Sequence, residues 1–200
     1  MAKAATNTFM DKLYADAFRA GLTKGTKESE DWFRKKLAKV KSVNRQELLK
    51  DENFITRASP QNLPGRLFMY FYDPKTKKEL PYYDRFPLTF LVEKAKGGFY
   101  GLNMHYLHPR QRAIFFDKLT DYATGKSDKQ RLKLTYNLLK GTSKLKEFQP
   151  CFKHYLSGHI RSKIVEIPSS EWEAVMYLPT EFFMKKPKTT VFARSRKQYS

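Results

Sequence analysis

The stretch FPLTFLVEKAKGGFYGLNMHYL, residues 86–107, decides the fold class of this chain. Two apolar runs flank the dipeptide Gly97-Gly98, and this combination predicts a tight β-hairpin. Both runs place apolar residues at odd and even positions, which indicates that both faces of the sheet are covered. The aromatic run RLFMYFY, residues 66–72, predicts another strand before a turn with a basic tip. We therefore expect a small antiparallel sheet, either SH3-like or a half-open barrel.

Helical periodicity surrounds the predicted sheet and makes the expected class α+β. On the N-terminal side, Phe9, Leu13 and Ala17 indicate a helix, and Ser29 is the expected cap of a second. An extended connector marked by two prolines follows at residues 51–65. On the C-terminal side we expect two helices that begin near Arg110 and Asp128, followed by a helix over 148–156. An edge strand over 159–167 comes next, and then a short helix capped by Ser169-Ser170 and Glu173.

The domain organisation follows from these boundaries and from the charge. We expect an N-terminal helical arm and linker over residues 1–60, because its helices have apolar stripes too narrow to stand alone. A globular α+β body follows over 61–184, and a basic tail without acidic residues occupies 185–200.

Composition limits the functional classes. The chain has 200 residues, with 16 Phe and 12 Tyr, which is enough apolar material for a core. No apolar run reaches the roughly 18 residues of a membrane span, so we expect no membrane partner. Cys151 is the single cysteine, so no intrachain disulfide forms and a reducing compartment is expected.

The net charge is the strongest indication of a partner. Lys and Arg number 39 against 20 acidic residues, a net charge of +19. A compact body with this charge repels itself, which points to nucleic acid before a membrane surface or an acidic protein. Residues 125–200 carry 16 basic and 6 acidic side chains, so the positive field is concentrated there. The expected contacts with nucleic acid or a protein partner are Lys144, Lys146, Lys153, Arg161, Lys163, Lys185, Lys186, Lys188, Arg194, Arg196 and Lys197.

Motifs for catalysis or cofactors are incomplete. Cys151, His154 and His159 have metal-like spacing, but no second pair completes the four ligands of structural zinc. Asp84 and Glu93 resemble part of a metal-dependent nuclease site, but the lysine expected two residues after Glu93 is displaced to Lys96. Phosphate-binding loops and nucleophile elbows are missing from the sequence. We therefore expect no enzyme activity, metal or cofactor.

Three blocks of sequence resemble a family of small basic proteins encoded by T4-like contractile-tailed phages. They are RLFMYFYDPKTKKELPYYDRFPL (66–88), GGFYGLNMHYL (97–107) and FQPCFKHYLSGHIRSKIVEIP (148–168), and the resemblance extends from about Gly65 to Leu178. It implies a virion-associated protein of the DNA end protector or head, neck and baseplate type, present in the host cytoplasm during assembly. It implies no catalytic residue.

Two function hypotheses follow, and a third is weaker. The first is a non-enzymatic structural adaptor of the phage particle, in the baseplate, neck or completed head, with other virion proteins as partners. The alternative is a protein that binds double-stranded DNA without sequence preference and protects genome ends. The third is a metal-dependent, end-processing nuclease. Basic residues interleaved with aromatic residues over 144–163 suit phosphate contacts, with optional stacking on unpaired bases.

Overall fold

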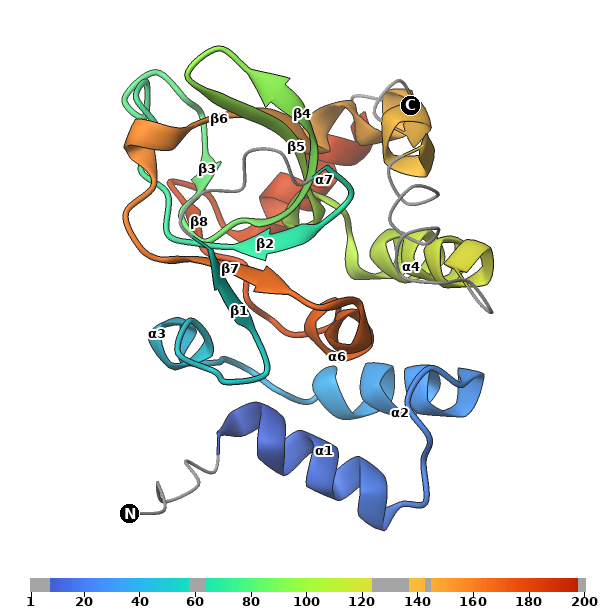
Figure 1. Cartoon of the computed structure of the whole chain (residues 1–200). Helices are drawn as coiled ribbons and strands as arrows, with labels where there is room; N and C mark the ends of the chain where they lie inside the picture. The colour runs from blue at the N-terminus through green and yellow to red at the C-terminus, as the bar shows by residue number, and fades with distance from the viewer. Residues whose placement is uncertain (1–7, 58–63, 124–136, 143–144, 198–200) are drawn as a thin grey trace, which may run out of the picture.

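The predicted hairpin is present and lies near the centre of the main sheet (Figure 1). In the computed structural model, which describes residues 8–57, 64–123, 137–142 and 145–197, β4 (Leu88–Ala95) pairs antiparallel with β5 (Gly98–Asn103). Gly97 adopts φ 75°, a left-handed conformation that glycine takes without steric cost. A Cβ on Gly98 would lie 1.8 Å from the Tyr155 carbonyl oxygen, so the neighbouring strand also requires glycine there.

The described residues form a six-stranded antiparallel sheet in the order β1-β7-β2-β4-β5-β6. Besides the hairpin it contains β1 (Ile55–Arg57), β2 (Leu67–Met69), β6 (Phe152–Leu156) and β7 (Ile164–Ile167). A separate pair joins β3 (Tyr83–Asp84) to β8 (Phe183–Met184). The predicted α+β class is confirmed.

The sheet curls without closing into a barrel. After β6 the chain returns onto the segment that follows β2, where Tyr72 and Ile160 form an isolated bridge. The Arg161 backbone N–H also donates to the Phe71 carbonyl over 2.7 Å. A small core fills the inside of this curl, and its members come from five strands and the segment after β2: Phe68, Tyr70, Tyr72, Leu91, Phe99, Tyr155 and Ile164.

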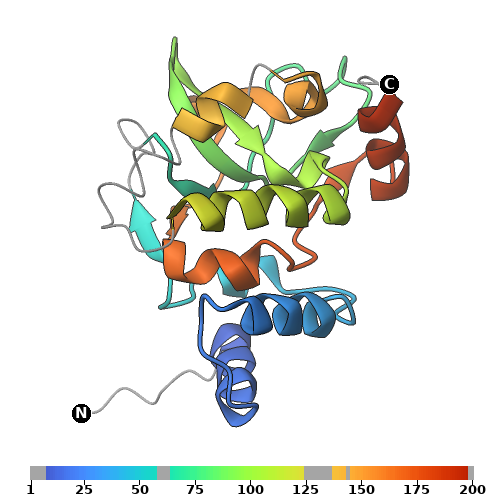
Figure 2. The same cartoon turned by 90° about the vertical axis from the view of Figure 1, so that its right-hand side faces the viewer.

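Helices cover the other face of the sheet (Figures 1 and 2). Phe90 of β4 packs its ring 6.2 Å from Phe115 of α4 (Pro109–Ala123) and 5.0 Å from Trp172 of α6 (Trp172–Val175). Alternation along β4 sends Leu88, Phe90 and Val92 into this larger core. Both sheet faces are therefore buried, as the continuous apolar pattern predicted.

The N-terminal helices extend the helical side of the molecule, and the second of them packs against α6 (Figure 1). They are α1 (Phe9–Arg19), α2 (Lys27–Leu37) and α3 (Arg45–Leu48), and α1 begins with a capping box of Thr8 and Asp11. Their buried residues, which include Leu13, Phe33 and Leu48, belong to the same core as the helix-facing side of the sheet. The boundary at residue 60 stays a prediction, but the core continues across it. The cap of α2 is Thr26 and not Ser29, which is the third helical residue and completes that capping box.

Two further predictions of local structure were wrong. Residues 148–156 form a 3-10 turn, η2 (Lys146–Cys151), and then β6, because Pro150 lacks the N–H that a helix requires. The predicted edge strand over 159–167 is shorter and central, since β7 lies between β1 and β2. The strand at that edge of the sheet is instead β1, which lies within the segment predicted to be an extended connector. The helix predicted from Asp128 begins outside the described residues, and 137–142 are helical.

Residues of the predicted basic tail form a helix, α7 (Lys188–Lys197). Val191 and Phe192 are buried on its inner side, and the Phe192 ring lies 5.5 Å from His108 and 6.5 Å from Phe183. Arg194, Arg196 and Lys197 occupy the last turn, where cations interact favourably with the helix dipole. The two inward apolar residues thus attach the basic C-terminal region to the body. Among the described residues, no helix combines the length and apolar character needed to cross a bilayer.

Candidate nucleic-acid interface

Acidic side chains neutralise cations mainly around the N-terminal helices and α6. Asp16 pairs with Arg19 and Lys36, and Glu171 pairs with Lys24. At the sheet edge, buried Glu166 accepts from both Arg57 and Arg66. These pairs offset part of the positive charge on this part of the molecule.

The surface of β8 and α7 has a different charge balance. Residues 182–197 contain no acidic side chain. We call the exposed cations of this segment the C-terminal basic face: Lys185, Lys186, Lys188, Arg194, Arg196 and Lys197. This face lies at the opposite end of the molecule from α1 (Figure 2). Six predicted contact residues therefore lie exposed on one folded segment, which runs from the end of β8 through α7.

Lys185 connects the basic face to the turn over residues 73–80. Its Nζ donates to the carbonyls of Lys78 and Leu80 over 2.9 and 2.7 Å. Its backbone adopts φ 69°, which is uncommon for a residue with a side chain. Lys185 therefore positions this turn, and a substitution there would change structure as well as charge.

A cavity of about 310 Å³ opens between this turn and β6. We call it the tyrosine cavity, because five tyrosines contribute to its wall: Tyr72, Tyr82, Tyr83, Tyr106 and Tyr155. Its other lining residues include Lys75, Lys153 and His154. The Lys153 Nζ lies 4.4 Å from the centroid of the Tyr106 ring, and the Arg194 guanidinium lies 5.8 Å from that of Tyr82. Arg194 therefore joins the C-terminal basic face to the mouth of the cavity.

The other predicted contact residues lie apart from this cavity. Arg161 is exposed and donates to the Gly158 carbonyl over 2.9 Å. Lys146 in η2 and Lys163 before β7 are exposed, and neither lines the cavity. Lys144 lies outside the described residues. Lys153 is the exception among them: it lines the cavity and is half-buried, because β6 turns it toward the tyrosines.

Sequence reasoning missed the role of the tyrosines. The segment PYYD at residues 81–84 received no role of its own from the sequence, yet it supplies Tyr82 and Tyr83 to the cavity. The basic tip of that turn was noted, and it supplies Lys75. The close spacing of aromatic and basic residues was the available signal, but the pairing of β3 with β8, about a hundred residues away in sequence, was not visible.

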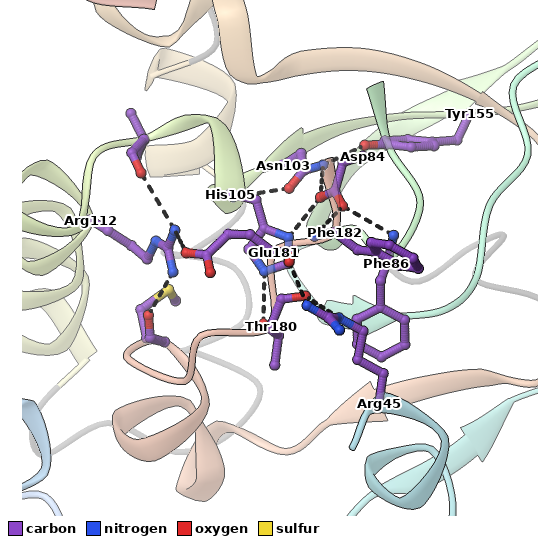
Figure 3. Close-up of polar contacts among 12 residues, drawn as sticks. Arg45, Asp84, Phe86, Asn103, His105, Arg112, Tyr155, Thr180, Glu181 and Phe182 are labelled. Atoms are coloured by element: carbon purple, nitrogen blue, oxygen red, sulfur yellow. Dashed lines mark hydrogen bonds and ion pairs between the residues drawn. The ribbon is translucent and has the colours of Figure 1, made fainter. Parts of the chain in front are cut away.

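A buried polar network lies behind the tyrosine cavity (Figure 3). His105 Nδ1 is 2.6 Å from Asp84 Oδ2, and His105 Nε2 is 2.8 Å from Thr180 Oγ1. Burial opposes ionisation of Asp84, but His105 and hydrogen bonds from Asn103 and Phe86 outweigh it and keep the Asp84 pKa below its ordinary value. The order of side chains resembles that of a catalytic triad. His105 and Thr180 are 0 % exposed, so we interpret the network as a connection between β3, the end of β5 and the segment before β8.

The environment of Asp84 thus differs from that of the metal-dependent nuclease carboxylate that it resembles in the sequence. Its carboxylate accepts hydrogen bonds from the Asn103 side chain and from the Phe86 and Phe182 backbones. Glu93 is exposed in β4 and directly follows the register shift between Leu91 and Glu93. Among the described residues, no group of three or more His, Cys, Asp or Glu side chains has the geometry of a metal site.

Cys151, His154 and His159, whose spacing resembles that of metal ligands, also lie in different environments. Cys151 is buried, and burial raises the pKa of its thiol to about 12. His154 is exposed with its ring 5.0 Å from Tyr100, while His159 Nδ1 lies 2.8 Å from the Asp73 carbonyl.

Comparison with protein-family models gives a match over residues 2–199 to the family described as phage T4 terminal DNA protecting protein. The chain belongs to this family. The match extends the resemblance beyond residues 65–178 to the N-terminal helices and the C-terminal basic face. Comparisons with curated proteins and with solved structures gave no match.

Proposed function

We propose that the chain is a non-enzymatic DNA-binding protein that covers the ends of a phage genome. The observation that carries this proposal is the family match over residues 2–199, combined with a basic face of six exposed cations without acidic neighbours in sequence. The family favours genome-end protection over the adaptor role that was ranked first from the sequence. A location in the phage particle or the infected cell accords with this function.

The chemistry of the basic face supports contacts to DNA phosphates. Lysine and arginine that neutralise phosphates release condensed counterions, and this contribution does not depend on base sequence. α7 packs Phe192 against His108 and Phe183, and its exposed positions include lysine and arginine side chains that suit contacts with phosphates. We therefore propose binding without base readout.

Salt titration of duplex binding tests this proposal. If about six phosphates are contacted, the slope of log K against log salt is about −5. Replacing Lys186, Lys188 and Lys197 with Gln removes three exposed charges of the basic face, and the slope should become shallower by about 2.5. Lys185 stays unchanged in this variant because of its bonds to the turn.

The matched control removes three exposed lysines near the other end of the molecule, Lys12, Lys39 and Lys41. This variant has the same net charge and should keep the wild-type slope. Equal slopes for the two variants would contradict a defined interface on the C-terminal basic face. The same samples, incubated with Mg²⁺ and analysed on a gel, should retain full-length duplex; shortened DNA would contradict the non-enzymatic part of the proposal.

A further inference from the structure

The tyrosine cavity has the size and composition of a ligand site. Its volume of about 310 Å³ is near the lower end of the range of about 300–1,000 Å³ for small-molecule pockets. Aromatic rings dominate its wall, and polar groups at a few positions provide orientation. Tyr72, Tyr106 and Tyr155 are fixed in the core, while Tyr82 and Tyr83 are only half-buried and border the opening.

Lys153 is a cation in this cavity without a counter-charge. No carboxylate forms an ion pair with it in the described part of the chain. Burial lowers the pKa of its ammonium group, which means that the surroundings disfavour its charge. The ring of Tyr106 at 4.4 Å supplies part of the missing stabilisation. An anionic group bound in the cavity would supply the rest.

Further cations lie where the cavity opens. Lys75 is exposed and forms part of the lining, and Arg194 lies over the ring of Tyr82. The one carboxylate in the lining, Asp84, is already engaged by His105 and Asn103. Flat aromatic faces together with cations in the lining and at the opening are the combination that binds an unpaired nucleotide, with the base stacked on the rings and the phosphate against the cations.

From this arrangement we infer that the tyrosine cavity binds the unpaired terminal nucleotide of a single-stranded extension at a DNA end. The inference rests on the proposed function, and it identifies which structure of the end is recognised. A base inside an intact duplex has no free face for stacking, so frayed or extended ends are selected over duplex interiors. Lys153 and Lys75 contact the phosphate, and Arg194 continues the contacts toward the C-terminal basic face.

The test compares two labelled duplexes, one with blunt ends and one with a three-nucleotide thymidine extension. Wild-type protein should bind the extended duplex at least about fivefold more tightly, the lower limit for stacking of one base on an aromatic side chain. Tyr82→Leu removes the exposed stacking ring and should reduce this ratio to near one. Lys75→Gln, at an exposed position where folding is not at risk, should reduce the ratio about twofold.

Tyr177→Leu is the matched control. Tyr177 is also half-buried, and the Arg34 guanidinium lies 5.3 Å from its ring centroid, but it lies far from the cavity lining. This variant should keep the wild-type ratio. A wild-type ratio near one, or an unchanged ratio in both cavity variants, would overturn the inference while leaving DNA binding intact. Failure of wild-type protein to bind either duplex would overturn the proposed function itself.

Discussion

At the scale of single residues, the buried ion pair of Arg112 and Glu181 joins two elements of the fold. The Arg112 side chain is 2 % exposed, and its Nη2 lies 2.7 Å from Glu181 Oε1. Arg112 also donates to the carbonyls of Met176 and Leu107. Burial opposes ionisation of Glu181, but Arg112 outweighs it and lowers the Glu181 pKa from 4.5 to about 2. The pair connects α4 to the segment before β8 (Figure 3).

This pair should make the stability of the protein decrease at acidic pH. Because the folded-state pKa of Glu181 is depressed, its contribution is fully present above about pH 4.5 and is lost as the pH falls toward 2. Glu181→Gln leaves a buried guanidinium unpaired and should cost about 3–5 kcal/mol at pH 7. Urea denaturation should also show a weaker fall in stability between pH 4.5 and 2 for this variant. A loss below 1 kcal/mol, or the wild-type pH dependence, would contradict this role.

At the scale of elements, the sequence predicted what depends on local patterns. The hairpin at Gly97-Gly98, the first helix and the helix from Pro109 follow from glycine conformation, capping and periodicity. The strand β6 was missed because FKHYL places its only fully buried residue, Tyr155, among half-buried and exposed residues. Its strand conformation comes from pairing with β5, which lies about fifty residues earlier.

The attachment of the N-terminal helices also depends on distant contacts. The Gly25 N–H donates to Glu173 of α6 over 3.1 Å, and the Ser29 hydroxyl donates to the same carboxylate. The ring of Phe33 in α2 is 0 % exposed and packs at 6.0 Å from Tyr14 of α1. From sequence alone, these helices had apolar stripes with no assigned partner.

Phe33→Ala should therefore destabilise the entire molecule. Removal of this buried ring should cost about 3–5 kcal/mol. Thermal unfolding followed by circular dichroism should show one cooperative transition at lower temperature. A separate early transition that involves only part of the helical signal would instead support residues 1–60 as an independent arm.

At the scale of the whole molecule, charge is divided between two ends. Around the N-terminal helices, acidic side chains pair with many of the cations, whereas the C-terminal basic face has exposed cations and no acidic residue in its segment. Net charge by segment predicted this division. It did not predict that residues 188–197 are folded, because only Val191 and Phe192 attach α7 and two apolar residues give no clear helical period.

The position of the tyrosine cavity could not be predicted from the sequence either. Its wall combines residues from 72–84, Tyr106 and residues 153–156, which come together only when the sheet curls. The sequence did indicate the relevant chemistry, cations beside aromatic rings. The cavity lies next to the C-terminal basic face because β3 pairs with β8 and because Arg194 contacts the ring of Tyr82.

The central claim is that the protein binds DNA at its ends, and competition between two forms of one plasmid tests it most directly. Labelled short duplex bound to wild-type protein is titrated with covalently closed plasmid or with the same plasmid cut once. At moderate salt, the cut plasmid should displace the label at a lower concentration, since only it supplies ends. Equal displacement by both forms at every concentration would show that the protein binds DNA along its length and would contradict the claim.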